Sequence, residues 1–494
     1  MAYGGLSTTA SEGTFTPSVR ALADRAFSRA AGAPLVAGNG VRLLRDAHEN
    51  YPAWLEAIAR ASHHVHLETF FIYDDAAGEM FAEALIQAAR RGVTVRVAYD
   101  WLGSFWKAGG RFWKRLRLEG VEVRCYNPPR LEAPLGWVSR DHRKMLAVDG
   151  EVGFITGLCV GQMWLGDPAK GVEPWRDTGI EVRGPAVADI ERAFARVWGM
   201  MGPAFEEDEC LRGTPAEAGT VSVRIVATEP TTAGMFRVDQ LIAALARHRV
   251  WLTDAYYAGT TLYVQALRAA AQNGVDVRLL VPGSTDIPLL RPLTRAGYRP
   301  LLEAGVRVFE WNGTMLHAKT AVADGHWARV GSTNLNIASW LGNCELDAIV
   351  EDEPFAREME AMYLEDLGNA TEVVLQGRRR MRAARGPAEV HRPSGRGRGS
   401  ASRAAAGAIR IGNAIGAAFT NRRTLGPVEA RLAVTVGLAL LALAVLFAFF
   451  PRALAYPLVA LLAWVALSLL YRGYQLSIST PQSIDKSRDR QIRK

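Results

Sequence analysis

One short pattern occurs twice in this chain, and the repetition constrains the fold more than any other feature of the sequence. The second copy starts at His317, reads HAKTAVADGHWARVGSTN and has the spacing H-x-K-x4-D-x6-G-S-x-N. The first copy starts 175 residues earlier, at His142, and reads HRKMLAVD. A single octapeptide can arise by chance. Two copies at this distance indicate duplication of a whole domain, because the units of a solenoid are much shorter.

The residue types in the two copies suggest chemistry at phosphorus. Alternate residues of a β-strand share a face, so the histidine and lysine of each copy would point into one site. A neutral imidazole can attack phosphorus, and a second one can protonate the departing alcohol and deprotonate the incoming one. Lysines can hold the phosphate oxygens. The residues His142, Lys144, His317 and Lys319 therefore predict two-step phosphodiester cleavage that requires no metal or other cofactor. The alternative is that they are incidental strand residues.

Strands and helices alternate in the same order around both motifs. Helices predicted at 51–62 and 79–91 surround the apolar strand HVHLETFFI, and a helix predicted at 238–249 leads to the strand RVWLTDAYY. Such alternation favours an α/β layered fold. An earlier strand, within 33–44, is expected to turn at the Asn-Gly pair at 39–40.

The first copy carries ten extra residues before its histidine, in the stretch NPPRLEAPLGWVSRD. An insertion beside a catalytic strand is a candidate for gating or for substrate contact. Leu135 and Trp137 could contact acyl chains there. An ordinary packed surface loop is the alternative.

The paired motifs resemble those of the phospholipase D superfamily, whose members bring two such motifs into one active site. The resemblance is closest to bacterial cardiolipin synthases, through phrases such as AIARASHHVHLETFFIYDD and WRDTGIEVRGPAV, and it covers about residues 32–365. It implies two tandem phospholipase-D-like α/β/α sandwich domains, at 32–205 and 206–376, related by pseudo-twofold symmetry. The catalytic residues that it implies are His142, Lys144, Asp149, Asp177, His317, Lys319, Asp324, Asn334 and Glu345.

Two of these residues are expected to support the histidines. Glu345 lies 28 residues past His317, and in superfamily members with this spacing a carboxylate hydrogen-bonds the histidine, which would fix its tautomer and stabilise the charged ring. In the first copy the same task would fall to Asp177. An exposed strand carboxylate is the alternative for Glu345.

The first copy departs from the family pattern after its motif strand. Where the second copy has GSTN, ending at Asn334, the first has TGLC, ending at Cys159. Many cardiolipin synthases carry glycine-glycine-isoleucine-asparagine here. The missing asparagine predicts an altered or weakened phosphate cradle with activity retained.

The reaction implied by the resemblance joins two phosphatidylglycerol molecules into cardiolipin and releases glycerol through a phosphohistidine intermediate. We assign the attack to His142 and the proton transfers to His317, although the roles could be exchanged. Alternatives are hydrolysis of phospholipids to phosphatidic acid, a superfamily nuclease and a noncatalytic membrane scaffold. Residues 1–376 hold 38 Lys and Arg against 46 Asp and Glu, a net charge of −8, which disfavours nucleic acid as a partner. The sequence leaves the oligomeric state open.

The C-terminal part of the chain predicts a membrane attachment. Residues 377–431 form a basic linker rich in Arg, Gly and Ala, and residues 432–471 contain two uncharged runs of nineteen residues separated by Pro451 and Arg452. Each run is about long enough to cross the bilayer, so we expect a transmembrane helical hairpin, or a re-entrant one. The basic tail at 472–494 and the linker would both be cytoplasmic, next to the anionic inner leaflet of a bacterial inner membrane.

The other end of the chain and its cysteines give weaker indications. Residues 1–31 are read as a polar leader with a short helix and no secretory signal. The four cysteines, Cys125, Cys159, Cys210 and Cys344, show neither CxxC nor zinc-like spacing. They favour a reducing compartment.

Overall fold

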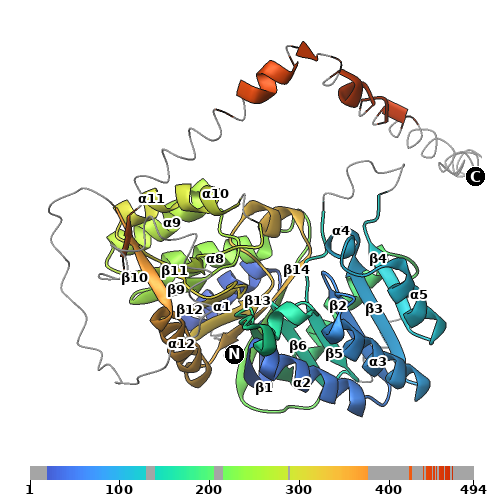
Figure 1. The fold of residues 1–494 in the computed structure, drawn as a ribbon. Coiled ribbons are helices and arrows are strands. Elements are labelled where there is room, and N and C mark those ends of the chain that lie inside the picture. The colour runs from blue at the N-terminus through green and yellow to red at the C-terminus, as the bar shows by residue number, and fades with distance from the viewer. Residues whose placement is uncertain are drawn as a thin grey trace, which may run out of the picture.

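The computed structural model describes most of the two repeats and little of what surrounds them (Figure 1). Described are residues 19–129, 139–204, 215–287, 290–375 and 422–424, and short stretches between 438 and 470. The insertion with Leu135 and Trp137, residues 1–18, most of the basic linker and the tail at 472–494 lie outside the described residues. So does part of the predicted hairpin at 432–471.

The first repeat alternates helices with strands and carries its motif at β5. Its elements, after the leading helix α1 (Val19–Ala31), are β1 (Val36–Arg45), α2 (Asp46–Arg60), β2 (His64–Thr69), α3 (Ala76–Arg90), β3 (Thr94–Asp100), α4 (Trp101–Ser104), α5 (Gly110–Leu118), β4 (Glu122–Tyr126), β5 (Met145–Val148), β6 (Val152–Thr156), the 3₁₀ turns η2 (Gln162–Trp164) and η3 (Pro168–Lys170), β7 (Thr178–Arg183) and α6 (Val187–Met200).

The second repeat follows the same plan and carries its motif at β12. Its elements are β8 (Val221–Thr228), α8 (Gly234–Leu245), β9 (Arg249–Thr253), α9 (Thr261–Gln272), β10 (Asp276–Pro282), α10 (Leu290–Ala296), α11 (Tyr298–Glu303), β11 (Arg307–Trp311), β12 (Thr320–Ala323), β13 (Trp327–Gly331), the π-helical turn η4 (Ala338–Gly342), β14 (Glu345–Glu351), α12 (Glu353–Gly368) and β15 (Ala370–Val374). A short strand, β16 (Arg422–Thr424), pairs with β15.

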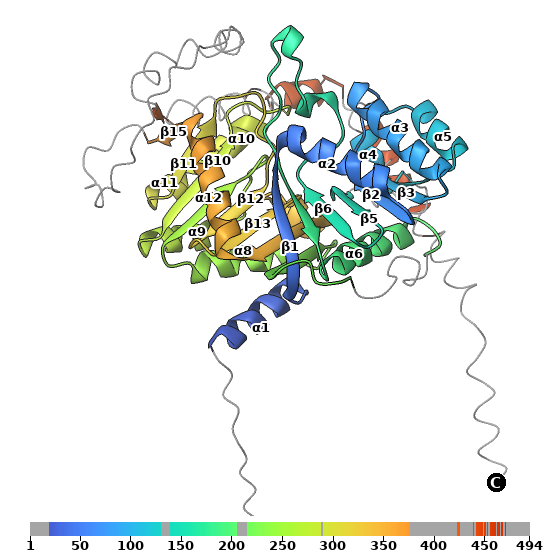
Figure 2. The ribbon, with the colours of Figure 1, turned by 90° about the horizontal axis from the view of Figure 1, so that it is seen from below.

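All of these strands belong to one mixed sheet with the order β16-β15-β11-β10-β9-β12-β13-β14-β8-β1-β7-β6-β5-β2-β3-β4. The order read outward from β8 mirrors the order read outward from β1: β14, β13, β12, β9, β10 and β11 correspond to β7, β6, β5, β2, β3 and β4, and β15 and β16 extend the second half. The strands β1 and β8 pair antiparallel at the centre, and Figure 2 shows β1 between the two halves. The prediction of an α/β fold with two repeats is confirmed.

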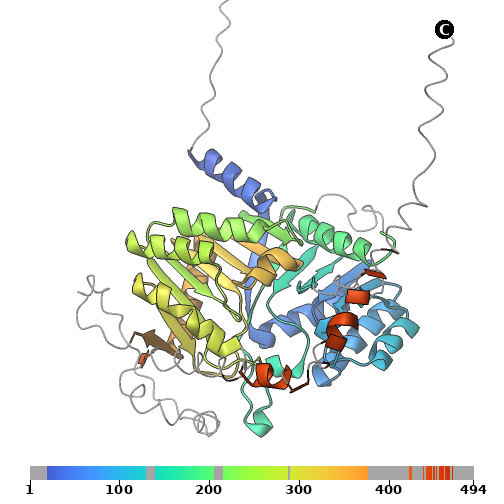
Figure 3. The same cartoon turned by 90° about the horizontal axis from the view of Figure 1, so that it is seen from above.

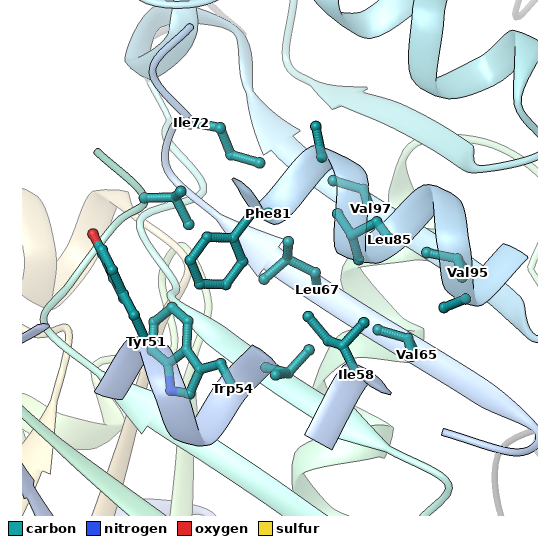
Figure 4. Close-up of a cluster of buried hydrophobic side chains, with 14 of the residues drawn as sticks. Tyr51, Trp54, Ile58, Val65, Leu67, Ile72, Phe81, Leu85, Val95 and Val97 are labelled. Atoms are coloured by element: carbon teal, nitrogen blue, oxygen red, sulfur yellow. The ribbon is translucent and has the colours of Figure 1, made fainter. Parts of the chain in front are cut away.

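Helices cover both faces of the sheet and bury its apolar side chains. On one face of the first repeat, α2 and α3 contribute Tyr51, Trp54 and Phe81, which pack on Val65 and Leu67 of β2 (Figure 4). A second cluster belongs to both repeats: α6 contacts β8, and α12 contacts β1. Since this shared core joins the repeats, their relative position is fixed by packing and by the sheet together.

The turn predicted at residues 39–40 is absent, because both residues lie inside β1. The Asn39 side chain donates to the carbonyls of Val36 and Val221 and accepts the N–H of Ala186, so it holds β1, β8 and the start of α6 together. Its hydrogen bonds are tertiary and replace the local ones that an Asn-Gly turn would make.

Within the described residues, no helix combines the length and the apolar character needed to cross a membrane. The described pieces between 438 and 470 include helical turns at 441–447 and 455–460. Figure 1 shows these pieces beyond the edge of the body that carries α4 and α10, and Figure 3, seen from that side, shows them in front of it.

Candidate active site

The two motif strands begin at the junction of the repeats, where each is bonded to the other repeat. The N–H of His142 donates to the Cys344 carbonyl at 2.9 Å, just before β14. The N–H of His317 donates to the Arg176 carbonyl at 2.7 Å, just before β7. Each motif histidine is therefore placed by a segment of the opposite repeat, the one before β14 for His142 and the one before β7 for His317.

The first histidine is held by a carboxylate from the second repeat. Nδ1 of His142 lies 3.0 and 2.9 Å from the two carboxylate oxygens of Glu345. Glu345 is fully buried and also accepts the hydroxyl of Ser332 at 2.6 Å. The carboxylate is thereby fixed, and it orients the imidazole with Nε2 as the atom left for chemistry.

The second histidine is held in the reciprocal way. Nδ1 of His317 lies 2.8 Å from Asp177 Oδ2, which also accepts the indole N–H of Trp164 at 3.0 Å. The other oxygen of Asp177 accepts the N–H of Thr178. The prediction that each carboxylate bonds the histidine of its own repeat is wrong, because both pairs form across the repeats.

A residue difference between the copies matches the difference in carboxylate length. Ser332 of the second copy corresponds to Gly157 of the first. A Cβ on Gly157 would lie 2.1 Å from Asp177 Oδ1, so the shorter aspartate occupies the space that a side chain would take. Asp177 accepts a hydrogen bond from the indole N–H of Trp164, and Glu345 accepts the corresponding one from the hydroxyl of Ser332.

The two lysines lie beside the histidines and are almost completely buried. Lys144 and Lys319 each donate to the carbonyl of the histidine two residues before them. The Lys319 Nζ also lies 3.0 Å from both ring nitrogens of His317. Burial lowers the pKa of Lys319 to about 8, against the opposing effect of Asp177, so its proton is held weakly near neutral pH.

Both histidines are held neutral, and the charges of both repeats act on each of them. Burial lowers the pKa of His142, with Lys144 and Lys319 adding to the effect and Glu345 opposing it. Burial, then Lys319, lowers the pKa of His317 to about 4, with Asp177 opposing and Lys144 adding a smaller effect. Since each lysine perturbs the histidine of the other repeat, the two halves form one electrostatic site. An anionic phosphate bound there would raise both histidine pKa values.

The motif aspartates lie away from the histidines, at the far ends of the motif strands. Asp149 has φ of 55° and follows the far end of β5, where its carboxylate accepts the N–H groups of residues 62, 63 and 64 at 2.8 Å. Asp324 has φ of 51° and accepts those of residues 247, 248 and 249 in the same way. Each aspartate ties the end of its motif strand to the start of the neighbouring strand, β2 or β9.

Comparison with known proteins shows the family of this chain. A family model described as "Cardiolipin synthase, PLD-like domain" matches residues 54–198 and 240–367. The chain is 31% identical over 359 residues to a cardiolipin synthase of Halalkalibacterium halodurans, covering 71% of this chain and 70% of that protein. It is 33% identical over 372 residues to cardiolipin synthase A of Pseudomonas aeruginosa strain PAO1, covering 72% and 73%. The chain belongs to the cardiolipin synthase PLD-like family.

The fold of this family member also resembles a more distant solved structure. The crystal structure of phosphatidylserine synthase from Haemophilus influenzae Rd KW20 matches with a TM-score of 0.56 at 12% identity. The match covers 70% of this chain and 91% of that chain. At this identity the likeness concerns the fold alone.

The asparagine position of the motif differs between the two halves of this family member. Asn334 is 3% exposed, and its Oδ1 has no hydrogen-bond partner among the described residues. Its counterpart Cys159 is equally buried, and the Cys159 carbonyl accepts the hydroxyl of Tyr51 at 2.8 Å. The loop is therefore held in place without an amide, and only the second half presents one to a ligand.

Aromatic side chains that sequence reasoning did not select enclose both imidazoles of this family member. The ring of Phe70 meets His142 edge to face at a centroid distance of 5.1 Å. Trp164, Trp175 and Tyr256 surround His317 at 5.6, 5.8 and 5.7 Å. Their positions in the chain carry no motif, so only the fold reveals them. Both imidazoles are almost completely buried, which strengthens the electrostatic interactions inside the site.

One group of potential metal ligands was found among the described residues, away from the two motif histidines. His64, His66 and Glu191 are buried between β2 and α6. The carboxylate lies 2.8 Å from Nε2 of His64 and 2.6 Å from Nδ1 of His66. Burial alone would raise the pKa of Glu191, but the two histidines outweigh it and lower it to about 2. The three groups are bonded to one another, which identifies a structural polar cluster of the core.

Proposed function

We propose that this protein is a phosphatidyltransferase that makes cardiolipin from two phosphatidylglycerol molecules. The observation that carries the proposal is the reciprocal pairing of His142 with Glu345 and of His317 with Asp177, with two buried lysines beside them. The named relatives are cardiolipin synthases. Two oriented imidazoles and two cations in a dry site are the groups that a double displacement at phosphorus requires.

In the first step, Nε2 of His142 attacks the phosphorus of one phosphatidylglycerol. A nitrogen–phosphorus bond forms and the bond from phosphorus to the glycerol headgroup oxygen breaks. His317, which is protonated once the bound phosphate has raised its pKa, gives that oxygen its proton. Lys144, Lys319 and Asn334 hold the phosphate oxygens and offset the charge of the transition state. Glu345 stabilises the positive charge that develops on His142.

In the second step, the terminal hydroxyl of another phosphatidylglycerol attacks the phosphohistidine. Its proton passes to His317, the nitrogen–phosphorus bond breaks, and cardiolipin leaves. Water in place of the lipid alcohol would give phosphatidic acid, so the aromatic enclosure of the histidines favours transfer over hydrolysis by limiting access of water.

We assign the attack to His142 because of the contacts at the two Nε2 atoms. Lys319 Nζ lies 3.0 Å from Nε2 of His317, which suits that ring to exchanging a proton with a lysine whose pKa is about 8. Among the described residues, none hydrogen-bonds Nε2 of His142. Its lone pair is therefore available to attack phosphorus once phosphate is bound.

We propose further that residues 432–471 attach the enzyme to the bacterial inner membrane, with the two repeats on the cytoplasmic side. Apolar side chains in the described pieces of this segment are exposed, including Leu441, Phe449 and Leu467. Basic residues flank the segment on both sides, which favours a cytoplasmic position for both flanks.

The deciding experiment incubates the purified protein with phosphatidylglycerol vesicles and identifies the lipids by mass. Cardiolipin with an equal amount of free glycerol is the expected result. Phosphatidic acid alone would make the enzyme a hydrolase, and no lipid product together with nicked DNA in a parallel reaction would overturn the lipid assignment.

A trapping experiment tests the division of roles between the histidines. In a single turnover stopped with alkali, which preserves phosphohistidine, His317→Ala should still form phosphatidyl-protein, although more slowly because the leaving glycerol is not protonated. His142→Ala should form none. The reverse pattern would exchange the two roles.

A further inference from the structure

The segment that follows β3 exposes large apolar side chains to solvent. Trp106 is 90% exposed, and Phe105 and Leu102 are 47% and 44% exposed. The rings of residues 105 and 106 contact each other, and that of Phe105 also contacts Trp101. Such a cluster on a protein surface marks an interaction site. We call Leu102, Phe105 and Trp106 the apolar tip.

The apolar tip lies close to the site, because its base is fixed to the segment that contacts His142. The residue after the tip, Lys107, places its Nζ 3.8 Å from the ring centroid of Phe71, and its carbonyl accepts the N–H of Asp74. A Cβ on Gly103 would lie 2.2 Å from the carbonyl oxygen of Phe70, whose ring contacts His142. The tip is thus anchored to the segment that follows β2 and contacts the imidazole.

The second repeat presents exposed apolar side chains at the equivalent end of its strands. Leu262 lies in the first turn of α9, and Ile337 and Leu341 lie at η4, which follows the Asn334 loop. They are 65%, 60% and 42% exposed. Exposed apolar residues from both repeats therefore surround the end of the sheet where the two histidines lie.

Basic side chains accompany the apolar tip. Arg111 and Lys114 are exposed on α5, which begins just after the tip. Tryptophan and phenylalanine at the level of lipid headgroups, with lysine and arginine beside them, form the combination that binds anionic bilayers. A protein partner would require a complementary surface, whereas the lipid substrates must reach this site with their acyl chains.

We propose that the apolar tip inserts into the surface of an anionic phospholipid bilayer and holds the entrance of the site against it. This inference rests on the proposed function, because it gives water-insoluble substrates a route from the bilayer to His142. The described pieces between 438 and 470 lie on the same side of the body, beyond the edge that carries α4 and α10 (Figures 1 and 3). The membrane segment and the apolar tip would then face one bilayer.

The test compares two substrates with the same headgroup, a long-chain lipid in a bilayer and a short-chain lipid dissolved as a monomer. The full-length protein carrying both Phe105→Asp and Trp106→Asp is assayed with phosphatidylglycerol in vesicles and with dihexanoyl-phosphatidylglycerol below its micelle concentration. We expect a loss of roughly tenfold or more on vesicles, the effect of removing one to two kcal/mol of interfacial binding. We expect an unchanged rate on the dissolved lipid.

Leu118→Asp serves as the matched control. Leu118 is 76% exposed at the opposite end of α5, so its substitution should leave both rates unchanged. A photoreactive amino acid at 106 should cross-link to lipid in vesicles, and the same group at 118 should not.

Other outcomes would overturn the inference in distinguishable ways. Equal losses on both substrates, or no loss on vesicles, would show that the tip does not act through the bilayer, and cross-linking at 106 to a protein instead of lipid would assign the tip to a protein partner. If the unsubstituted protein formed cardiolipin from neither substrate, the proposed function would fail, while the cross-links would still report whether the tip contacts lipid.

Discussion

At the scale of single residues, the site depends on carboxylates that bind Nδ1 of each histidine. The carboxylate fixes the imidazole tautomer and opposes the effect of burial on its pKa. The side chains of the two carboxylates differ in length by one methylene. Glu345 accepts a hydrogen bond from Ser332, whereas Asp177 accepts one from Trp164 and fits against Gly157, which has no side chain. The two half-sites are therefore related by topology but differ in their detailed contacts.

Neutralising either carboxylate should slow the reaction and shift a different limb of its pH profile. Glu345→Gln and Asp177→Asn should each lower kcat by about 10²- to 10⁴-fold, as expected for a misoriented catalytic base. Both carboxylates raise the pKa of their histidine, so removing the charge lowers that pKa. The acid limb should move to lower pH in Glu345→Gln, because His142 must be neutral to attack. The basic limb should move to lower pH in Asp177→Asn, because His317 must be protonated.

The pH–rate profile of kcat measures both shifts. Glu365→Gln, at a carboxylate that pairs with Arg45 on the surface, is the control and should match the unsubstituted enzyme. Identical profiles for Glu345→Gln and Asp177→Asn would contradict separate roles for the two histidines.

A methyl group at position 157 should change the orientation of His317 indirectly, by displacing Asp177. Gly157→Ala places a carbon where Asp177 Oδ1 now lies at 2.1 Å, so the carboxylate must move. We expect kcat to fall about 10²-fold, the usual cost of a displacement of about 1 Å at a catalytic group. Gly109→Ala, which meets open space, should retain full activity, and full activity in Gly157→Ala would show that the carboxylate can move without cost.

At the scale of elements, the motif aspartates hold the turns that lead out of β5 and β12. Each accepts three backbone N–H groups at the start of a neighbouring strand and has a positive φ, a conformation that Asp and Asn tolerate better than other residues. Because histidine, lysine and aspartate belong to one short motif, sequence alone suggests one catalytic task for all three. Their positions on the motif strand differ. The histidine and the lysine, two residues apart, face the site at the start of the strand, whereas the aspartate follows the opposite end of the strand.

Replacing a motif aspartate should therefore reduce stability more than chemistry. Asp149→Ala should lose about 2 kcal/mol of unfolding free energy, since charge-assisted bonds to three backbone N–H groups are lost and alanine disfavours the positive φ. Asp149→Asn should lose less, because asparagine keeps an acceptor and tolerates that conformation. Denaturant unfolding in detergent measures both values. A stably folded Asp149→Ala protein without turnover would instead place Asp149 in the reaction.

At the scale of the whole molecule, the two repeats form one folding unit. The continuous sheet, the shared core of α6 and α12, and the exchanged carboxylates all join them. Arg143, the residue between the motif histidine and lysine, is fully buried and donates to the carbonyls of Glu345, Thr228 and Ala193. Two of these carbonyls belong to the second repeat, so this side chain connects the repeats directly beneath the site.

Arg143→Met should lower the stability of both repeats together. We expect a loss of about 3 kcal/mol, the usual effect of removing a buried charged partner, in a single unfolding transition. Tryptophan fluorescence and far-ultraviolet circular dichroism in denaturant would follow it. Arg42→Met is the control and should cost less than about 1 kcal/mol, because Arg42 is exposed and its partner Glu181 keeps a second ion pair with Arg183. Two separate transitions in either variant would show that the repeats fold independently.

The sequence by itself determined the repeat, the α/β class and the histidine–lysine pairs, because strand alternation and motif spacing are local properties that a chain carries in its order of residues. Only the tertiary structure decided which carboxylate serves which histidine, that Asp149 and Asp324 hold turns, that Asn39 lies within a strand, and that aromatic rings enclose the site. Each of these depends on contacts between segments distant in the chain, and their geometry is set when the two repeats pack across β1 and β8.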